Sequence, residues 1–331
     1  MRTSGGNWEN LSEVAKESPS AKKTERLELA KNASVDDTVV VVFASCLKHL
    51  TANEEVALSG VDSEGVHEMR VALRRLRSAV SDFREVITAV QVAWLKRETK
   101  WLMTSLGTAR DWDVFLSELL APVEAARPGD AGLAELRAAA EAEREKGYAR
   151  ATRAIRSPRY SALLARMRQW LSAKRHRQGR NHGRKSLEEP TRKLAARVLA
   201  KRHKAVLKLG RDFKRLSAEE RHQVRISLKK LRYTAEFFRS LYRKKREEAY
   251  FHALAQLQNS LGHLNDIVVA DHLLERLRVA RQDQSVSNRL SIAVGIVTGW
   301  FTDSASSFEH EAAANWRQFH DCDAFWAEKR S

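Results

Sequence analysis

A fifteen-residue stretch of this chain occurs twice, and the second copy follows the first at an offset of 155 residues, the interval from His67 to His222. Residues 66–80 read VHEMRVALRRLRSAV, and residues 221–235 read RHQVRISLKKLRYTA. The copies carry basic and apolar residues at most of the same places. The matched pairs include His67 with His222, Arg70 with Arg225, Arg74 with Lys229, Leu76 with Leu231, and Arg77 with Arg232.

A second pair of segments has the same spacing. LGTARDWDV at 106–114 matches LGHLNDIVV at 261–269, so that Asp111 corresponds to Asp266. Two separate matches in one register, with no net insertion between them, indicate a tandem duplication. Each copy must then fold into a similar unit, which restricts the architecture to two related halves. The copies are not identical, because Arg110 of the first corresponds to Asn265 of the second.

The composition favours helices throughout. Only 14 Gly and 5 Pro occur among 331 residues, and long stretches consist of Ala, Leu, Glu, Lys and Arg, which are strong helix formers. We therefore expect an all-α fold in which each half is a four-helix bundle and the two bundles are related by a pseudo-two-fold axis. The expected helices are 35–59, 63–88, 91–121 and 131–171 in the first half, and 188–215, 218–243, 246–280 and 286–320 in the second.

These helices divide the chain into four regions. Residues 1–33 are polar and are expected to form a loose leader, whereas 34–171 and 188–327 are the two halves. The segment between the halves, 172–187, contains six Lys or Arg and no acidic residue, which predicts a basic, solvated linker. Within the first half, Pro158 is expected to kink or split the fourth helix, because proline disrupts a helix interior.

The repeated stretch places its charge on one side of a helix. At about 100° per residue, Met69, Leu73 and Leu76 share a face that packs in the core, and the basic residues form a second row about a third of a turn away. Like charges along one face repel each other, which is tolerable on a solvated face and is relieved where an anion lies between them. A groove where the two rows meet is therefore predicted to bind phosphate groups. The rows are His67, Arg70, Arg74 and Arg77 in the first copy, and His222, Arg225, Lys229 and Arg232 in the second.

A third basic row precedes the second copy and has no equivalent in the first half. It has helical spacing and comprises Arg197, Lys201, Lys204 and Lys208. The corresponding residues of the first half are Val42, Cys46, His49 and Asn53. We therefore expect the second half to carry more of the charge and to make the tighter phosphate contacts.

The whole chain is strongly basic. Its 59 Lys and Arg against 42 Asp and Glu give a net charge of +17, which indicates an anionic partner. Cys46 and Cys322 form neither a disulfide framework nor a metal-binding motif, so a reducing cytoplasm is expected. No apolar run approaches the roughly 18 residues of a membrane span. We expect no cofactor and no association with a membrane.

Together, VHEMRVALRRLRS, LGTARDWDV, HQVRISLKKLRY and LGHLND resemble the CHAD domain, the conserved histidine α-helical domain, over about residues 34–327. The resemblance implies two four-helix bundles around a central basic channel that binds inorganic polyphosphate without catalysis. It also implies association with polyphosphate granules and with CYTH-type phosphatases. Carried over by position, the channel residues are His67, Arg70, Arg74, Arg77, His222, Arg225, Lys229 and Arg232. Lys201, Lys204 and Lys208 are added from the third basic row alone.

Other functions agree less well with the sequence. His67 and His222 are flanked by Arg rather than by further metal ligands, which disfavours a metal site. No P-loop, Gly-rich phosphate loop or GxSxG motif is present, so no enzymatic activity is expected. Two alternatives remain: non-specific nucleic-acid binding, which the net charge permits, and a granule scaffold whose basic surface binds acidic proteins. The basic rows carry no interleaved aromatic residues for base stacking, which favours polyphosphate over nucleic acid.

Overall fold

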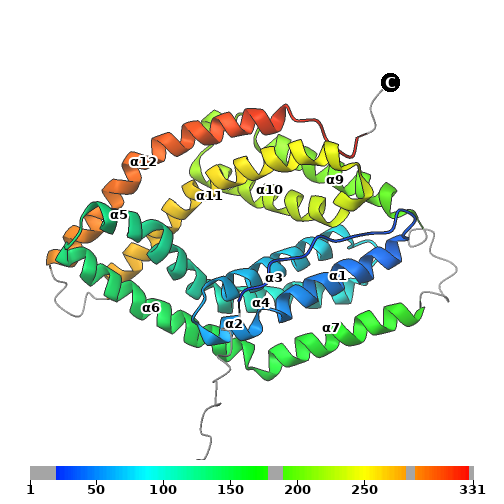
Figure 1. Cartoon of the computed structure of the whole chain (residues 1–331), viewed down its shortest axis with the longest axis horizontal. Coiled ribbons are helices and arrows are strands. Elements are labelled where there is room, and N and C mark those ends of the chain that lie inside the picture. The colour runs from blue at the N-terminus through cyan, green and yellow to red at the C-terminus, as the bar shows by residue number, and fades with distance from the viewer. Residues whose placement is uncertain (1–19, 178–188, 281–287, 328–331) are drawn as a thin grey trace, which may run out of the picture.

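The computed structural model describes residues 20–177, 189–280 and 288–327. Its regular elements in these residues are all helices, so the expected all-α class is confirmed (Figure 1). None of these helices is both long and apolar enough to cross a membrane. The first half contains α1 (Val35–Thr51), α2 (Glu54–Ser59), α3 (Glu64–Asp82), α4 (Ala89–Val114), the π-helix η1 (Phe115–Leu120), α5 (Ala121–Ala126), α6 (Ala131–Ile155) and α7 (Pro158–Arg177). The second half contains α9 (Thr191–Leu209), the 3₁₀-helix η2 (Phe213–Arg215), α10 (Ala218–Phe238), the 3₁₀-helix η3 (Arg239–Leu241), α11 (Lys244–Ala280) and α12 (Asn288–His320).

The helix boundaries follow the repeat. α4 begins at Ala89 and α11 at Lys244, an interval equal to the 155-residue offset of the sequence. The fourth helix differs between the halves, because the first half interrupts it between Ile155 and Pro158 whereas α12 is continuous. Pro158 lacks the amide hydrogen that a helix interior needs, so it begins a new helix, α7, as expected from the sequence.

Two hydrophobic cores hold the molecule together, and each contains residues of both halves. In the larger core, the rings of Phe83 and Phe238 pack edge to face with centroids 6.0 Å apart. In the smaller core, Phe115 of η1 and Leu136 of α6 pack with Leu274 of α11. Figure 1 shows this second region at the left end, where α5 and α6 meet α11 and α12. The two halves therefore form one packed unit.

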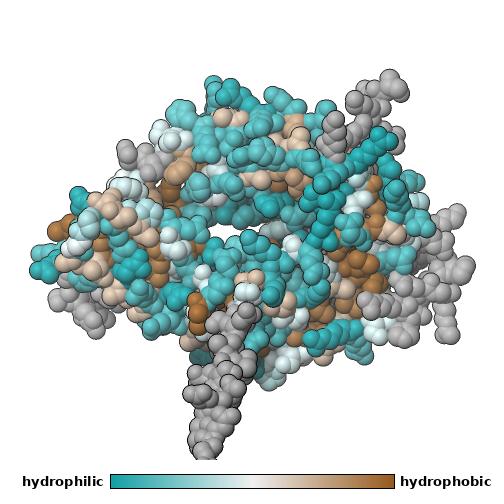
Figure 2. Space-filling model, viewed as in Figure 1, coloured by the Kyte–Doolittle hydropathy of each residue, from teal (hydrophilic) through white to brown (hydrophobic). Residues whose placement is uncertain are grey.

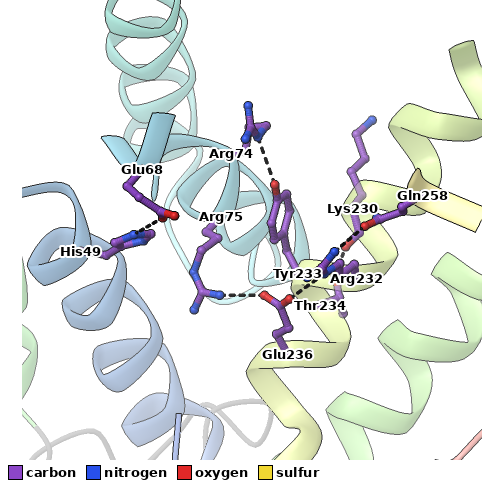
Figure 3. A network of polar contacts seen from close by, with 10 residues as sticks. All are labelled: His49, Glu68, Arg74, Arg75, Lys230, Arg232, Tyr233, Thr234, Glu236 and Gln258. Atoms are coloured by element: carbon purple, nitrogen blue, oxygen red, sulfur yellow. Dashed lines mark hydrogen bonds and ion pairs between the residues drawn. The ribbon is translucent and has the colours of Figure 1, made fainter. Parts of the chain in front are cut away.

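Buried polar contacts fix α3 against α10 near the middle of the molecule (Figure 3). Arg75 is buried, its Nη1 donates to Glu236 at 2.8 Å, and its guanidinium lies over the ring of Phe237. Asp82, also buried, accepts from the hydroxyl of Thr234 and from Nη2 of Arg202, both at 2.6 Å. A buried charge is strongly unfavourable without its partner. These pairs therefore hold the basic faces of the two halves next to each other.

The ends of the predicted regions differ from the expectation. The expected loose leader is wrong for residues 20–33, because Leu27 and Leu29 are buried and the amide of Leu29 donates to Oγ of Ser240 at 3.0 Å. The basic linker begins later than 172, because α7 continues to Arg177. Residues 1–19 of the expected leader and 178–187 of the expected linker lie outside the described residues.

A candidate anion-binding cavity

A cavity of about 670 Å³ lies where α3, α4, α9 and α10 come together. Among the described residues that line it, eight are basic and none is acidic. Figure 2 shows an opening bordered by hydrophilic residues between the layer of α10 and α11 and the layer of α3 and α4. A concave site of one charge sign focuses potential and attracts counter-ions. The basic lining residues are Arg70, Arg74, Arg77, Lys96, Lys100, Arg202, Lys229 and Lys230.

Arg74 and Tyr233 join the two halves within the cavity. Nε of Arg74, on α3, donates to the hydroxyl of Tyr233, on α10, at 3.0 Å. Figure 3 shows Arg74 and Lys230 extending to one side of the interface between α3 and α10, while Arg75 and its partner Glu236 lie on the other side. Arg74 and Lys230 therefore line the cavity, whereas Arg75 lies on the other side of the interface and helps to pack α3 against α10.

In each half, the repeated basic stretch lies next to the repeated LG…D stretch. Nη2 of Arg225 lies 3.8 Å from Oδ1 of Asp266, and Arg70 is neighboured by Asp111. Nη1 of Arg70 also donates to the carbonyl of Met103 at 2.9 Å. Burial lowers the pKa of both guanidiniums, and the two aspartates oppose that effect. The repeat of LG…D thus provides a counter-charge for Arg70, which lines the cavity, and for Arg225, which lies beside Lys229.

These two arginines retain hydrogen-bonding capacity. The Nε atoms of Arg70 and Arg225 are buried and have no hydrogen-bond partner among the described residues. A buried donor without an acceptor is destabilising by about 1–3 kcal/mol. A ligand that supplies hydrogen-bond acceptors near these Nε groups would therefore be favoured over an apolar one.

Lys229 is the most perturbed basic group of the cavity. Burial and the neighbouring Arg225, Arg74 and Arg70 lower its pKa to about 6, against an opposing effect of Asp266. Lysine ordinarily has a pKa near 10.4, so the charged form is strongly disfavoured here. Negative charge that enters the cavity would therefore stabilise the protonated form of Lys229.

The two histidines do not line this cavity. Burial, then Arg110 and Arg74, lower the pKa of His67 to about 4. His222 pairs its Nδ1 with Oδ1 of Asn265 at 2.7 Å and lines a separate pocket of about 570 Å³ between α10, α11 and α12. Asn265 thus stands beside the histidine of the second half in the place that Arg110 takes in the first.

One group of side chains near His67 has the composition of a metal site. Possible ligand atoms of Glu64, His67 and Glu68 lie within 4.8 Å of one another, a proximity that sequence reasoning did not foresee. Two contacts oppose a cation there. Glu68 is bonded to His49 at 2.8 Å, and Nη1 of Arg110 lies 3.6 Å from Glu64. These carboxylates already have cationic or hydrogen-bonding partners.

Of the site residues predicted from the sequence, the structure brings Arg70, Arg74, Arg77 and Lys229 together in the cavity, with Arg225 beside Lys229. It does not bring the others there. Arg232 donates instead to Glu236 at 2.9 Å and to Gln258 at 2.8 Å. Lys201, Lys204 and Lys208 are exposed and are not among the lining residues.

The excess of basic residues expected in the second half is not reflected in the lining of this cavity. Five of the eight basic lining residues come from the first half, on α3 and α4. The third basic row lies on α9, but only its neighbour Arg202 reaches the cavity.

Several lining residues were missed in the sequence. Lys96 and Lys100 are four residues apart on α4, a spacing that places them on one helix face. That spacing was a usable signal, but nothing in the sequence indicates that this face meets α3. Lys230 corresponds to Arg75 in the repeat, but Arg75 is buried whereas Lys230 lines the cavity.

Comparison with known proteins agrees with this architecture. The model of the CHAD domain family matches residues 41–275. The crystal structure of the CHAD domain from the plant Ricinus communis is 31% identical, covers 92% of this chain and 98% of its own, and superposes with a TM-score of 0.78. PptA from Streptomyces chartreusis, 14% identical, covers 86% of this chain and 100% of its own with a TM-score of 0.63, a likeness of fold alone.

Two curated relatives come from strains of Mycobacterium tuberculosis, the uncharacterized proteins MT2285 and Rv2226. Each is 29% identical over 176 residues, which make up 52% of this chain and 34% of the relative. The match thus spans about a third of the length of these relatives.

Proposed function

Since the chain belongs to the CHAD domain family, we propose that it binds inorganic polyphosphate, without catalysis, in the cavity between α3, α4, α9 and α10. The observation that carries the proposal is a lining of eight Lys and Arg with no acidic residue among the described residues. Polyphosphate has a negative charge on every unit and no bases, so it matches a site that offers eight cations and, among the described lining residues, a single aromatic side chain, Tyr233.

The types of side chain suit a phosphate chain. Arg70, Arg74 and Arg77 follow one face of α3 and present planar guanidiniums, which bind phosphate oxygens through paired hydrogen bonds. Lys96 and Lys100 add mobile point charges from α4. Cations from several directions can therefore contact successive phosphates of one chain.

The lining supports binding rather than catalysis. Among the described residues it contains no carboxylate, imidazole or thiol that could bind a metal ion. Its remaining polar groups are the hydroxyls of Ser78, Ser81, Thr104 and Tyr233. We therefore propose that the bound chain is held and not cleaved.

The finer expectations on architecture and cell biology are part of the same proposal. We propose that the halves are four-helix units related by a pseudo-two-fold axis, which the matched starts of α4 and α11 support. We also propose that the protein acts in the cytoplasm at polyphosphate granules, where CYTH-type phosphatases would share the same polymer.

The test compares two doubly substituted proteins of equal charge. Arg77→Glu with Lys100→Glu alters the cavity, whereas Lys204→Glu with Lys208→Glu alters the exposed face of α9. All four side chains are exposed, so both proteins are expected to fold. Affinity for labelled long-chain polyphosphate is measured by fluorescence anisotropy. The cavity variant should lose about 100-fold or more, because each lost charge-assisted contact costs about 1.5–3 kcal/mol. The α9 variant should lose much less.

Competition separates polyphosphate binding from the main alternative. The exposed row of Lys201, Lys204 and Lys208 favours non-specific binding of nucleic acid, whose affinity falls steeply with salt. Duplex DNA, at equal phosphate concentration and across a salt series, should displace little polyphosphate. Equal losses in the two variants, together with effective competition by DNA, would establish a general polyanion binder and overturn the cavity proposal.

A further inference from the structure

We propose that Lys229 takes up a proton when a densely charged anion enters the cavity, and that this proton uptake makes the site selective for such anions over those of lower charge density. The inference rests on the proposed function and identifies the residue that sets its specificity. The proton comes from water or buffer, and it converts the Lys229 amine to an ammonium.

The surroundings of Lys229 are strongly positive on every side for which neighbours are known. Arg225 lies one turn earlier on the same helix, and Arg70 and Arg74 face Lys229 from α3. Asp266 of α11 opposes these charges, and its carboxylate is shared with Arg225. The other charged or titratable groups of the cavity and its border are Arg77 of α3, Lys96 and Lys100 of α4, Asp111 behind Arg70, Arg202 of α9, and Lys230 and Tyr233 of α10.

This crowding decides the protonation state of the resting site. With its pKa lowered to about 6, Lys229 is charged in only about 1% of molecules at pH 8. Burial and three guanidiniums both favour the neutral amine. The cavity without a ligand therefore presents its arginines and exposed lysines to an anion, while the Lys229 amine is neutral.

A densely charged anion favours the protonated form of Lys229 over the neutral amine. Phosphates placed between Arg70, Arg74 and Arg225 neutralise the charges that disfavour the ammonium and add an acceptor for it. The pKa of Lys229 then rises in the complex, and its new charge adds to binding. An anion with sparse charges leaves the amine neutral and gains nothing from it. Selectivity follows because the contribution of Lys229 depends on the charge density of the ligand.

The sign of the pH effect follows from linkage. The complex binds one proton more than the free protein at any pH between about 6 and the pKa in the complex, so affinity for polyphosphate rises as pH falls through that range. The slope approaches tenfold per pH unit and disappears below about pH 6, where Lys229 is charged in both states. His67, with a pKa of about 4, is neutral throughout that range.

The experiment is calorimetric titration of long-chain polyphosphate at pH 8 in two buffers of different ionisation enthalpy, which gives the number of protons taken up. The wild-type protein should take up close to one proton per bound segment. Lys229→Arg and Lys229→Met, neither of which titrates there, should take up none. Lys204→Arg, a matched exchange on the exposed face of α9, should behave as the wild type. Two substitutions at Lys229 guard against one of them failing to fold, which thermal unfolding would reveal.

Selectivity is measured with the same proteins as the ratio of affinities for polyphosphate and duplex DNA at pH 8. Lys229→Arg, which is always charged, should reduce this ratio by about tenfold or more. Equal proton uptake in the wild type and both Lys229 variants, with polyphosphate binding intact, would overturn the role of Lys229 and leave the proposed function standing. Absence of polyphosphate binding in the wild type would instead overturn the proposed function itself.

Discussion

On α3, Arg77 lines the cavity and Arg75 is buried against α10, whereas on α10 the matching residues have the opposite roles: Lys230 lines the cavity, and Arg232 turns away to Glu236 and Gln258. The two helices carry the same pattern of basic residues, but the cavity lies at a different angle to each of them. A duplicated motif has therefore produced an asymmetric site. The repeat determines that both helices are basic, and the packing between the halves determines which cations face the anion.

The same contrast separates α1 from α9. Val42 and Cys46 of α1 are buried, and the thiol of Cys46 lies beside Arg75 of α3. The matching positions of α9 are open to water and carry the third basic row. The matched helices therefore differ in burial at these positions, which agrees with apolar residues on one and basic residues on the other.

The largest effect is expected where this contrast is broken in α1. Val42→Lys places on α1 a cation like that of its counterpart, Arg197, but in a position that is fully buried. We expect a loss of about 5 kcal/mol or failure to fold, because an unpaired buried charge is costly. The reverse exchange, Arg197→Val on exposed α9, should change stability by less than about 0.5 kcal/mol. Urea unfolding measures both, and similar losses would show that the faces do not differ in burial.

Much of this difference was present in the sequence. Met69, Leu73 and Leu76 were assigned to the core from their spacing alone and are buried. The burial of Leu27 and Leu29 was not anticipated, because a polar segment with two leucines has no periodicity that specifies a partner. Helical spacing specifies which residues share a face of one helix. It does not specify what that face meets.

The candidate site follows the same rule. Arg70, Arg74, Arg77 and Lys229, which the sequence places on one helix face in each copy, lie together in the lining of one cavity. The contributions of α4 and α9 depend on how four helices cross. That crossing is set by buried pairs such as Arg202 with Asp82, which join residues 120 positions apart in the sequence.

A smaller effect should distinguish the neighbourhoods of the two histidines. The folded protein keeps His67 neutral down to about pH 4, whereas the unfolded chain protonates it near pH 6.5. The unfolded state thus binds more protons between these values, and stability falls as pH falls from about 6.5 to 4. The expected loss is about 2–3 kcal/mol.

The measurement is urea unfolding at pH 7 and pH 4.5. His67→Gln should remove this part of the acid dependence. Arg110→Asn, which introduces the residue found beside His222, should reduce it, because Arg110 is the second cause of the lowered pKa after burial. Nuclear magnetic resonance titration of His67 in Arg110→Asn provides a direct check. A pKa that stays near 4 would show that Arg110 does not contribute to the shift and would leave it to burial and the other arginines.

The smallest effect concerns the exchange of roles between α3 and α10. Arg77→Gln and Arg232→Gln remove the same charge from matched positions of the repeat, but only Arg77 lines the cavity. Loss of Arg77 should weaken polyphosphate binding about tenfold, equivalent to about 1.4 kcal/mol. Loss of Arg232 should change affinity by less than about twofold, because its guanidinium is bonded to Glu236 and Gln258 on the other side of the interface. Anisotropy titrations at one salt concentration give both values. Equal losses would mean that the anion contacts both repeats alike, so that the bound site would be symmetric even though the cavity lining is not.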